Sequence, residues 1–384
     1  MADILRCYAE QYRNTHAVSH KQSKVMHHIQ ACRSAELGGH VQQCNHCGFE
    51  QIAYNSCRDR HCPKCQSMAK EQWLNDRKAE LVPCGYFHLV FTLPHELNPI
   101  VLCNKRITLQ LLFAAVNETL SAFARDPQWR LGGQLGFIAV LHTWSQTLID
   151  HFHLHCLIPA GALSPAKDKW IPARESFLFR IQSLANKFRK SYLNKLQQAY
   201  RKQQLILPGK TAQFASPHEF AQLLQSLSKT SWIAYAKRPF AGPEQVLEYL
   251  GRYTHRVAIS NNRIISIENG NIVFTYRDRQ RNNQLRTMTL SADEFIRRFL
   301  LHVLPAGFMK IRYFGFLSHR NKKKAVALIR TLIDANCPLP GKIKENIREL
   351  MLRLTGTDIT CCPKCLKGKM YTIKKLQPNY YNSS

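Results

Sequence analysis

The sequence predicts an α+β fold with a mainly antiparallel sheet flanked by helices. Two adjacent apolar stretches, residues 136–146 and 152–158, have the length and composition of strands. The short polar connection between them is typical of an antiparallel hairpin. Between residues 176 and 200 the apolar residues recur at helical spacing instead. The 384 residues are 45% hydrophobic, which indicates a globular chain long enough for two or three domains.

The remaining elements follow from local sequence. The stretch YFHLVFTL is rich in aromatic and β-branched residues and predicts a strand that Pro94 ends. Asn98 and Pro99 predict the start of a long helix, with Asn98 as its N-cap. Helices are predicted at residues 1–38, 67–81, 98–123, 176–200 and 243–253, and strands at residues 86–93, 136–146, 152–158, 231–237, 264–267, 272–276 and 286–290. Residues 301–384 are predicted to be helical, with a basic tail that contains cysteines.

The charge balance points to a polyanionic partner. Lys and Arg number 54 against 25 Asp and Glu, which gives a formal net charge of +29. Such an excess favours a nucleic acid as the partner. No signal peptide is expected at the N-terminus, and apolar runs such as residues 111–116 are too short to span a bilayer. The chain is therefore expected in the cytoplasm, in contact with DNA or RNA and not with a membrane.

Cysteines are dense near the N-terminus, and in a cytosolic chain such clusters predict metal ligands before disulfides. Cys44-x2-Cys47 and Cys62-x2-Cys65 are two CxxC knuckles separated by fourteen residues, which predicts one four-cysteine zinc site. Cys57 and His61 are alternative ligands, and His40 is a weaker one. Arg58, Arg60 and Lys64 lie among the ligands and are expected to contact DNA phosphates. The tail holds one further knuckle, Cys362-x2-Cys365, either a zinc half-site that other residues complete or a turn without metal.

A pair of histidines predicts a second metal site. On a strand, His153 and His155 point to the same face while Leu154 points into the core. Two adjacent imidazoles favour a divalent cation. The third ligand is expected from the neighbouring strand, with Gln146 as the first candidate and His151 as the substitute. An exposed polar strand face is the alternative interpretation.

A pair of tyrosines lies in YLGRY. Tyr249 and Tyr253 are four residues apart on a predicted helix, so they share one face. A phenol can attack a phosphodiester when a metal polarises the phosphate. Arg252, His255 and Arg256 flank the pair and could bind neighbouring phosphates. Packing in the core is the alternative role for two aromatics at this spacing.

A phosphate-binding loop is not expected. Residues 208–211 read PGKT, but the first glycine of the motif would fall at Gln204. The segment also follows a helix rather than a strand. The chain is therefore expected to use no nucleotide cofactor.

Five segments occur in an order that resembles a known family. After the CxxC pair come YFHLVFTLPHELN, HTWSQTLIDHFHLHCLIPAGALS, YAKRPFAGPEQVLEYLGRYTHRVAISNNRI and FLLHVLPAGFMKIRYFGFLSHR. This order strongly resembles the two-tyrosine, rolling-circle transposases of bacterial insertion sequences of the ninety-one type, in the HUH (His-hydrophobe-His) endonuclease superfamily. The resemblance covers nearly the whole chain, from about Cys32 to about Cys365.

The resemblance implies a five-stranded antiparallel sheet flanked by helices, with an N-terminal zinc-binding module and a helical C-terminal region. It implies His153 and His155 as ligands of Mg²⁺ or Mn²⁺, Tyr249 and Tyr253 as nucleophiles, and the N-terminal cysteines as ligands of structural Zn²⁺. The expected domains are a zinc-binding, DNA-binding domain at residues 1–82, a nuclease and strand-transferase domain at 83–300 with its tyrosine helix at 243–255, and a basic C-terminal region at 301–384.

The implied activity is nicking of single-stranded DNA at element ends, through a 5′-phosphotyrosine, followed by strand transfer into target DNA. Host replication or unwinding proteins are expected partners, because the chain has no helicase portion. Alternatives are a plasmid replication initiator or relaxase with the same chemistry, a metal-free tyrosine recombinase, and a non-enzymatic zinc-finger regulator. A carboxylate-triad transposase is disfavoured, because Asp and Glu are scarce around the histidines.

Overall fold

The structure of the chain is a computed structural model. It describes residues 1–78, 80–129, 131–174, 178–240, 251, 257–278, 281–333 and 345–379. The predicted tyrosine helix, apart from Gly251, lies outside these described residues.

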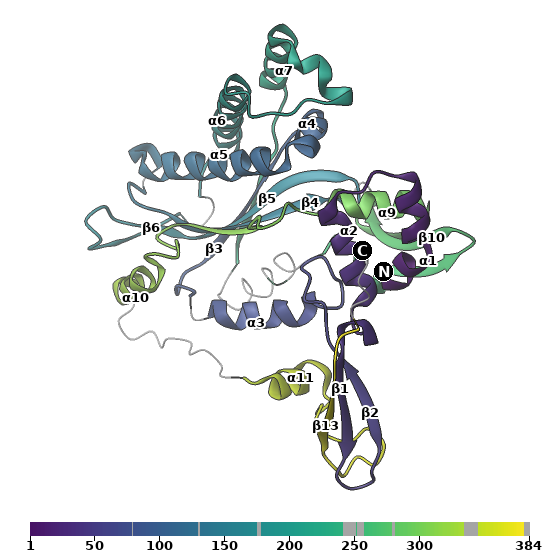
Figure 1. The fold of residues 1–384 in the computed structure, drawn as a ribbon. Coiled ribbons are helices and arrows are strands. Elements are labelled where there is room, and N and C mark those ends of the chain that lie inside the picture. The colour runs from purple at the N-terminus through teal and green to yellow at the C-terminus, as the bar shows by residue number, and fades with distance from the viewer. Residues whose placement is uncertain are drawn as a thin grey trace.

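Five antiparallel strands form a central sheet in the order β12-β4-β5-β3-β8. They span Tyr86–Thr92 (β3), Gly136–Trp144 (β4), Asp150–Pro159 (β5), Ala234–Phe240 (β8) and Ile311–Gly315 (β12). A small hairpin of β6 (Gly161–Leu163) and β7 (Trp170–Pro172) follows β5. Helices flank the sheet (Figure 1), so the predicted α+β class with a five-stranded antiparallel sheet is confirmed.

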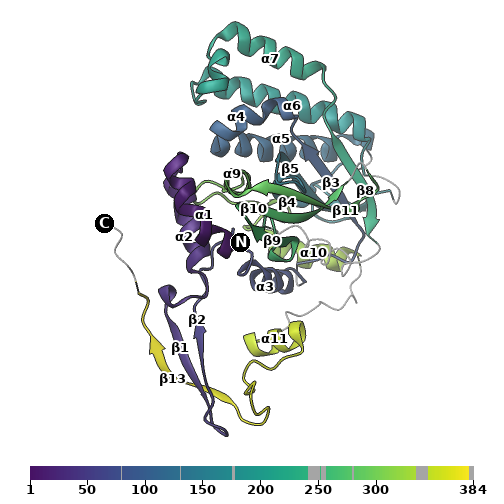
Figure 2. The same cartoon turned by 90° about the vertical axis from the view of Figure 1, so that its right-hand side faces the viewer.

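Helices stack on one face of the sheet, as Figure 2 shows for α5, α6 and α7. These helices are α4 (Asn98–Cys103), α5 (Lys105–Arg125), α6 (Ile181–Arg201) and α7 (Pro217–Lys229). Phe152 and Leu154 of β5 belong to the core beneath them, together with Phe113 of α5 and Phe188 of α6. α5 is long and apolar enough to cross a membrane, but 56% of its most apolar window is buried in the protein. It serves here as the central helix of this core.

A smaller core lies on the opposite face of the sheet. It is formed by Val140 of β4, Leu157 of β5 and Ile329 of α10 (Lys322–Ile333), and Leu74 of α3 (Gln66–Lys78) packs against it. Figure 1 shows α3 on the side of the sheet away from α5. The two faces of β5 therefore meet different helices.

The N-terminal helices join a separate antiparallel sheet. α1 (Ala2–Thr15) and α2 (His20–Ala31) share a core with α9 (Ala292–Leu301). The sheet consists of β9 (Ile264–Glu268), β10 (Asn271–Asp278) and β11 (Gln284–Ser291). Phe274 of β10 and Phe295 of α9 are fully buried in this core.

A strand from near the C-terminus joins two strands from the N-terminal part of the chain in a third sheet of order β13-β1-β2. It is built from β1 (Gly39–Cys44), β2 (Glu50–Tyr54) and β13 (Met370–Leu376), with α11 (Ile347–Thr355) just before the last strand. In both Figure 1 and Figure 2 this sheet projects away from the body of the protein.

Some elements differ from the sequence expectations. The C-terminal region, predicted to be helical, also contains β12 and β13, because β4 and β1 provide strand partners that the local sequence does not reveal. The helix predicted at residues 98–123 is divided at Asn104, whose side chain donates to the carbonyl of Ile100 and accepts from the N–H of Ile206. Strands β9, β10 and β11 form their own sheet.

Candidate functional site

The histidines lie on the sheet face that α5 and α6 do not cover. Because side chains alternate along β5, Phe152 and Leu154 enter the core on the α5 side. His153 and His155 consequently point to the other face, and Leu157, two residues further on, packs in the smaller core there. This confirms the predicted common face of His153 and His155.

A third histidine completes the cluster. His142 of β4 is directly opposite His153 of β5 in the antiparallel register. One possible ligand atom from each of His142, His153 and His155 lies within 4.8 Å of the others. The ring centroid of His142 is 4.5 Å from that of His155 and 5.4 Å from that of His153. Three imidazoles at this spacing can hold one divalent cation and leave coordination positions for a substrate.

Gln146, the expected third ligand, lies in a different place from the one predicted. β4 ends at Trp144, so Gln146 is in the turn before β5 and not on a strand. Its carbonyl accepts a hydrogen bond from Arg263. The register also shifts between His142 and Trp144, which a simple hairpin count does not include. The structure brings His142 of β4 to the histidine pair.

Hydrogen bonds orient the two rings of the pair. Nδ1 of His153 donates to the carbonyl of His151, 2.8 Å away. Nδ1 of His155 shares a hydrogen bond of 2.9 Å with Nε2 of His88 on β3. In both rings the protein engages Nδ1, so Nε2 is the atom that would coordinate an ion, an arrangement typical of metal-binding histidines. His88 was missed by sequence reasoning, although a histidine inside the apolar strand YFHLVFTL was an available signal.

A buried histidine supports the turn behind the cluster. Nε2 of His302 donates to the carbonyl of Leu148 (3.0 Å), and its Nδ1 lies 3.3 Å from the hydroxyl of Thr143. Burial lowers the pKa of His302 to about 4, so it is neutral at physiological pH. Trp144 stacks on His142, with ring centroids 5.0 Å apart. This packing fixes the end of β4.

The predicted tyrosine pair and its neighbours, Tyr249, Arg252, Tyr253, His255 and Arg256, lie outside the described residues. Gly251, midway between the two tyrosines, is described. A side chain there would lie 2.7 Å from Cδ1 of Leu74 and 2.8 Å from Cε of Lys70. The centre of the YLGRY segment is therefore in close contact with α3.

Eight cysteines form two separate clusters. One contains Cys32, Cys57, Cys62 and Cys65, and the other contains Cys44, Cys47, Cys362 and Cys365. The prediction that Cys44, Cys47, Cys62 and Cys65 share one ion is therefore wrong in its grouping. The residues between the two N-terminal knuckles form β2, which places the knuckles at opposite ends of a hairpin instead of side by side.

The first cluster lies beside the end of α2. Sulfur–sulfur distances are 3.5 Å for Cys32–Cys65, 3.6 Å for Cys57–Cys65 and 3.6 Å for Cys32–Cys62. Four tetrahedral Zn–S bonds of ~2.3 Å would separate the sulfurs by ~3.8 Å, so the set fits zinc. Cys57, an alternative ligand in the sequence, is a member. His61 is not in the cluster, and burial lowers the pKa of its imidazole to about 3.

The three basic residues near this cluster differ in their surroundings. Arg58 and Lys64 are exposed. Arg60 instead donates to the backbone carbonyls of Pro305 and Phe308, which ties the cysteine loop to the segment before β12. Arg60 therefore has a structural role that the sequence did not indicate.

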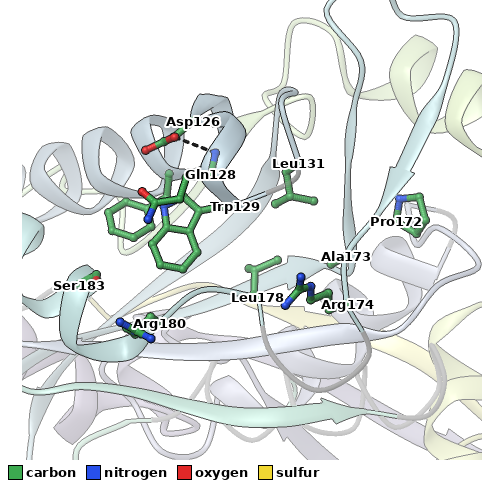
Figure 3. A pocket seen from close by; sticks show the side chains of 11 residues that line it. Asp126, Gln128, Trp129, Leu131, Pro172, Ala173, Arg174, Leu178, Arg180 and Ser183 are labelled. Atoms are coloured by element: carbon green, nitrogen blue, oxygen red, sulfur yellow. Dashed lines mark hydrogen bonds between the residues drawn. The ribbon is translucent and has the colours of Figure 1, made fainter.

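A pocket of about 430 Å³ lies apart from these sites (Figure 3). It is lined by Asp126 and Trp129, which follow α5, and by Arg174 and Arg180, which precede α6. Its apolar wall, including Leu178, belongs to the core on the α5 side of the sheet. None of the residues predicted from the sequence to form a site lines it.

The chain is similar to known transposases over most of its length. Residues 136–325 match a family model described as "Putative transposase", and residues 4–93 match one described as "Transposase zinc-binding domain". The chain is 47% identical over 377 residues to "Putative transposase y4qJ" of Sinorhizobium fredii, covering 97% of this chain and 94% of that protein.

A more distant relative is the transposase for insertion sequence element IS801 of Pseudomonas savastanoi pv. phaseolicola. It is 29% identical over 296 residues, which cover 76% of this chain and 68% of the relative. No solved structure matches the chain. By the extent of these matches, the chain belongs to the insertion-sequence ninety-one family of transposases and carries that family's N-terminal zinc-binding domain.

Proposed function

We propose that the chain nicks single-stranded DNA at the ends of its mobile element and transfers the cut strand by a rolling-circle type of mechanism. Tyr249 and Tyr253 are the nucleophiles, and His142, His153 and His155 hold the catalytic cation. The observation that carries the proposal is the three-histidine cluster on the sheet face away from α5, with His153 and His155 each oriented through Nδ1.

The contacts of Gly251 support a position of the tyrosines near the histidines. Gly251 packs on Leu74 of α3. Leu74 in turn packs on the core that contains Val140 and Leu157. Val140 is the cross-strand neighbour of His155, and Leu157 follows His155 on the same face of β5. One layer of packed side chains therefore connects the YLGRY segment to the histidine cluster.

The reaction needs a nucleophile and stabilisation of charge on phosphate. The Tyr249 or Tyr253 oxygen forms a bond to phosphorus and releases its proton, while the bond from phosphorus to the 3′ oxygen breaks and that oxygen gains a proton. The 5′-phosphate remains on the tyrosine, so rejoining requires no nucleotide cofactor. Mg²⁺ or Mn²⁺ bound at the histidines would act as a Lewis acid on the scissile phosphate. Arg252, His255 and Arg256 are proposed to bind adjacent phosphates.

The partners proposed are single-stranded element ends, target DNA, and host proteins for replication or unwinding. The net charge of +29 and the exposed Arg58 and Lys64 support phosphate contacts. A bacterial cytoplasmic location in association with the nucleoid is proposed for the same reason. A replication initiator or relaxase would share the chemistry but would act at a plasmid origin rather than at element ends.

Incubation of the full chain with labelled single-stranded element ends and Mn²⁺ tests the proposal. We expect the wild type to form a covalent protein–DNA adduct that survives denaturation. His153→Ala should form no adduct but should still bind DNA through its Lys and Arg residues. His95→Ala, at an exposed histidine, is the matched control and should behave as the wild type. Binding without any adduct would support a regulator, and an adduct formed in chelator would support a metal-free recombinase.

A further inference from the structure

The last strand of the chain pairs with the first. β13 runs antiparallel to β1 from the pair Gly39 and Leu376 to the pair Cys44 and Met370. β1 also pairs with β2 on its other side, so it is the central strand of this sheet. The tail knuckle, Cys362 and Cys365, consequently lies at the same end of the sheet as the knuckle of Cys44 and Cys47.

The four sulfurs of these knuckles surround a common centre. The Sγ atoms of Cys44 and Cys365 are 3.7 Å apart, and those of Cys47 and Cys362 are also 3.7 Å apart. This is the separation of ~3.8 Å that tetrahedral Zn–S bonds of ~2.3 Å produce. It is far longer than the ~2.05 Å of a disulfide bond. The four side chains are thus arranged as ligands of one ion.

Backbone N–H groups point at the sulfurs, as is favourable for thiolates. The amides of His46 and Cys47 donate to Sγ of Cys44, at 3.4 and 3.5 Å. In the tail knuckle, the amide of Gly368 donates to Sγ of Cys365 at 3.4 Å. The two turns therefore have the same local design, although they belong to opposite ends of the chain.

The two knuckles also bind each other directly. The amide of Asn45 donates to the carbonyl of Lys369 (3.1 Å), and the amide of Lys369 donates back to Oδ1 of Asn45 (2.8 Å). Any side chain at position 368 would lie 2.4 Å from Sγ of Cys44. Glycine at this position allows the tail to approach the N-terminal knuckle.

Apolar burial at this end of the sheet is small. Its core consists of Cys44, Cys362 and Met370, with Phe49 and Cys365 partly buried beside them. Residues 371–375 of β13 are exposed to solvent. A core of this size cannot offset the entropy of ordering a tail, whereas a bound metal contributes folding free energy outright.

We propose that Cys44, Cys47, Cys362 and Cys365 form a second structural zinc site, which fastens the C-terminal tail to the N-terminal hairpin. The zinc-binding family model ends at residue 93, so it includes all four cysteines of the first cluster but only half of this one. The second site would join the N-terminal hairpin and the C-terminal tail through one zinc ion. It also holds the basic strand β13, with Lys374 and Lys375 exposed, beside the N-terminal domain.

Zinc content of the purified full-length protein is the first measurement. We expect two zinc ions per chain in the wild type and one in the double variant Cys362→Ser/Cys365→Ser. Cys361→Ser is the matched control, because Cys361 is adjacent in sequence but belongs to neither cluster, and it should retain two. One zinc in the wild type, or two in the double serine variant, would overturn the proposal.

Hydrogen exchange and a rescue variant separate loss of the site from loss of the fold. In the double serine variant the amides of β13 should lose protection while those of β5 keep it. Cys365→His supplies another zinc ligand and should restore two ions per chain, whereas Cys365→Ser should not. If the amides of β13 are equally protected from hydrogen exchange with and without the second ion, zinc does not fasten the tail.

Discussion

Nε2 of His88 lies 2.9 Å from Nδ1 of His155, and the two rings are stacked with their centroids 5.2 Å apart. His88 is on β3 and His155 on β5, in adjacent strands of the central sheet. The hydrogen bond orients the ring of His155, and when Nδ1 of His155 donates to Nε2 of His88, Nε2 of His155 is free to bind a cation. His88 is therefore a positioning residue for the proposed cation.

We predict that His88→Ala weakens Mn²⁺ binding by about 10–100-fold, the usual effect of removing such a partner. His88→Gln keeps an amide that can hydrogen bond and should lose less. Calorimetric titration with Mn²⁺ measures the affinity, and urea unfolding of both variants checks the fold. If the alanine variant is folded and binds Mn²⁺ with the affinity of the wild type, His88 contributes only to packing.

The third ligand can be assigned by a pair of substitutions. His142→Ala should remove most Mn²⁺ affinity and abolish the DNA adduct, because it removes one of three converging imidazoles. Gln146→Ala should change both little, since Gln146 lies in the turn beyond β4. The opposite pattern, with Gln146 essential and His142 dispensable, would restore the expectation from the sequence.

The histidine pair was predictable because its geometry is local: alternation along one strand is enough to place His153 and His155 on a common face. The part played by His142 depends on the register between two strands, and a register shift beside Trp144 changes the count across the turn. No local pattern contains that information.

The grouping of the cysteines also depends on strand pairing that no local pattern reveals. CxxC spacing correctly indicated that cysteines of these turns lie in clusters, but it could not reveal which turns come together. Cys44 and Cys365 come together only because β13 pairs with β1. β12 was missed for a related reason, since its strand conformation depends on pairing with β4.

Stability should fall in mild acid because of His302. Burial lowers its folded-state pKa to about 4, below the usual ~6.5 of the unfolded chain. As pH falls from 6.5 to 4, the unfolded state gains a proton before the folded state does, so stability present above pH 6.5 is lost in that window. Between pH 7 and pH 5 the loss from this group is about 2 kcal/mol.

Urea unfolding at pH 7 and pH 5 measures this effect. In His302→Gln, the difference between the free energies of unfolding at pH 7 and pH 5 should shrink by about that amount. The reason is that the glutamine amide can donate to the carbonyl of Leu148 without titrating. His95→Gln, at an exposed histidine, is the control and should leave the difference unchanged. An unaltered pH dependence in the His302 variant would assign the acid sensitivity to other groups.

Both tyrosines are predicted to act. Transposition requires a cleavage at each end of the element, and the first occupies one phenol as a phosphotyrosine. Tyr249→Phe and Tyr253→Phe keep the ring but remove the attacking oxygen, so each should stop complete transposition. The double variant should form no adduct, and peptide mapping of the wild-type adduct should place DNA on one or both residues. DNA on another tyrosine would exclude this pair as the nucleophiles.

The contact between Gly251 and Leu74 gives a test of how α3 positions the tyrosine segment. Gly251→Ala has two opposing effects: alanine favours a helix over glycine by about 1 kcal/mol, but its methyl would lie 2.7 Å from Cδ1 of Leu74. Overpacking of this kind costs about 1–3 kcal/mol. Lys70 contributes little to the clash, because its Cε is near the end of a flexible chain.

A double-mutant cycle separates the two effects, because Leu74→Ala removes the clash and leaves the helix preference. Gly251→Ala should therefore be more favourable for stability in the Leu74→Ala background than in the wild type, by about 1 kcal/mol or more. Adduct formation should follow the same pattern, with Gly251→Ala lowering the yield and the double variant recovering part of it. If the two substitutions are additive in both measurements, α3 does not set the position of the tyrosines.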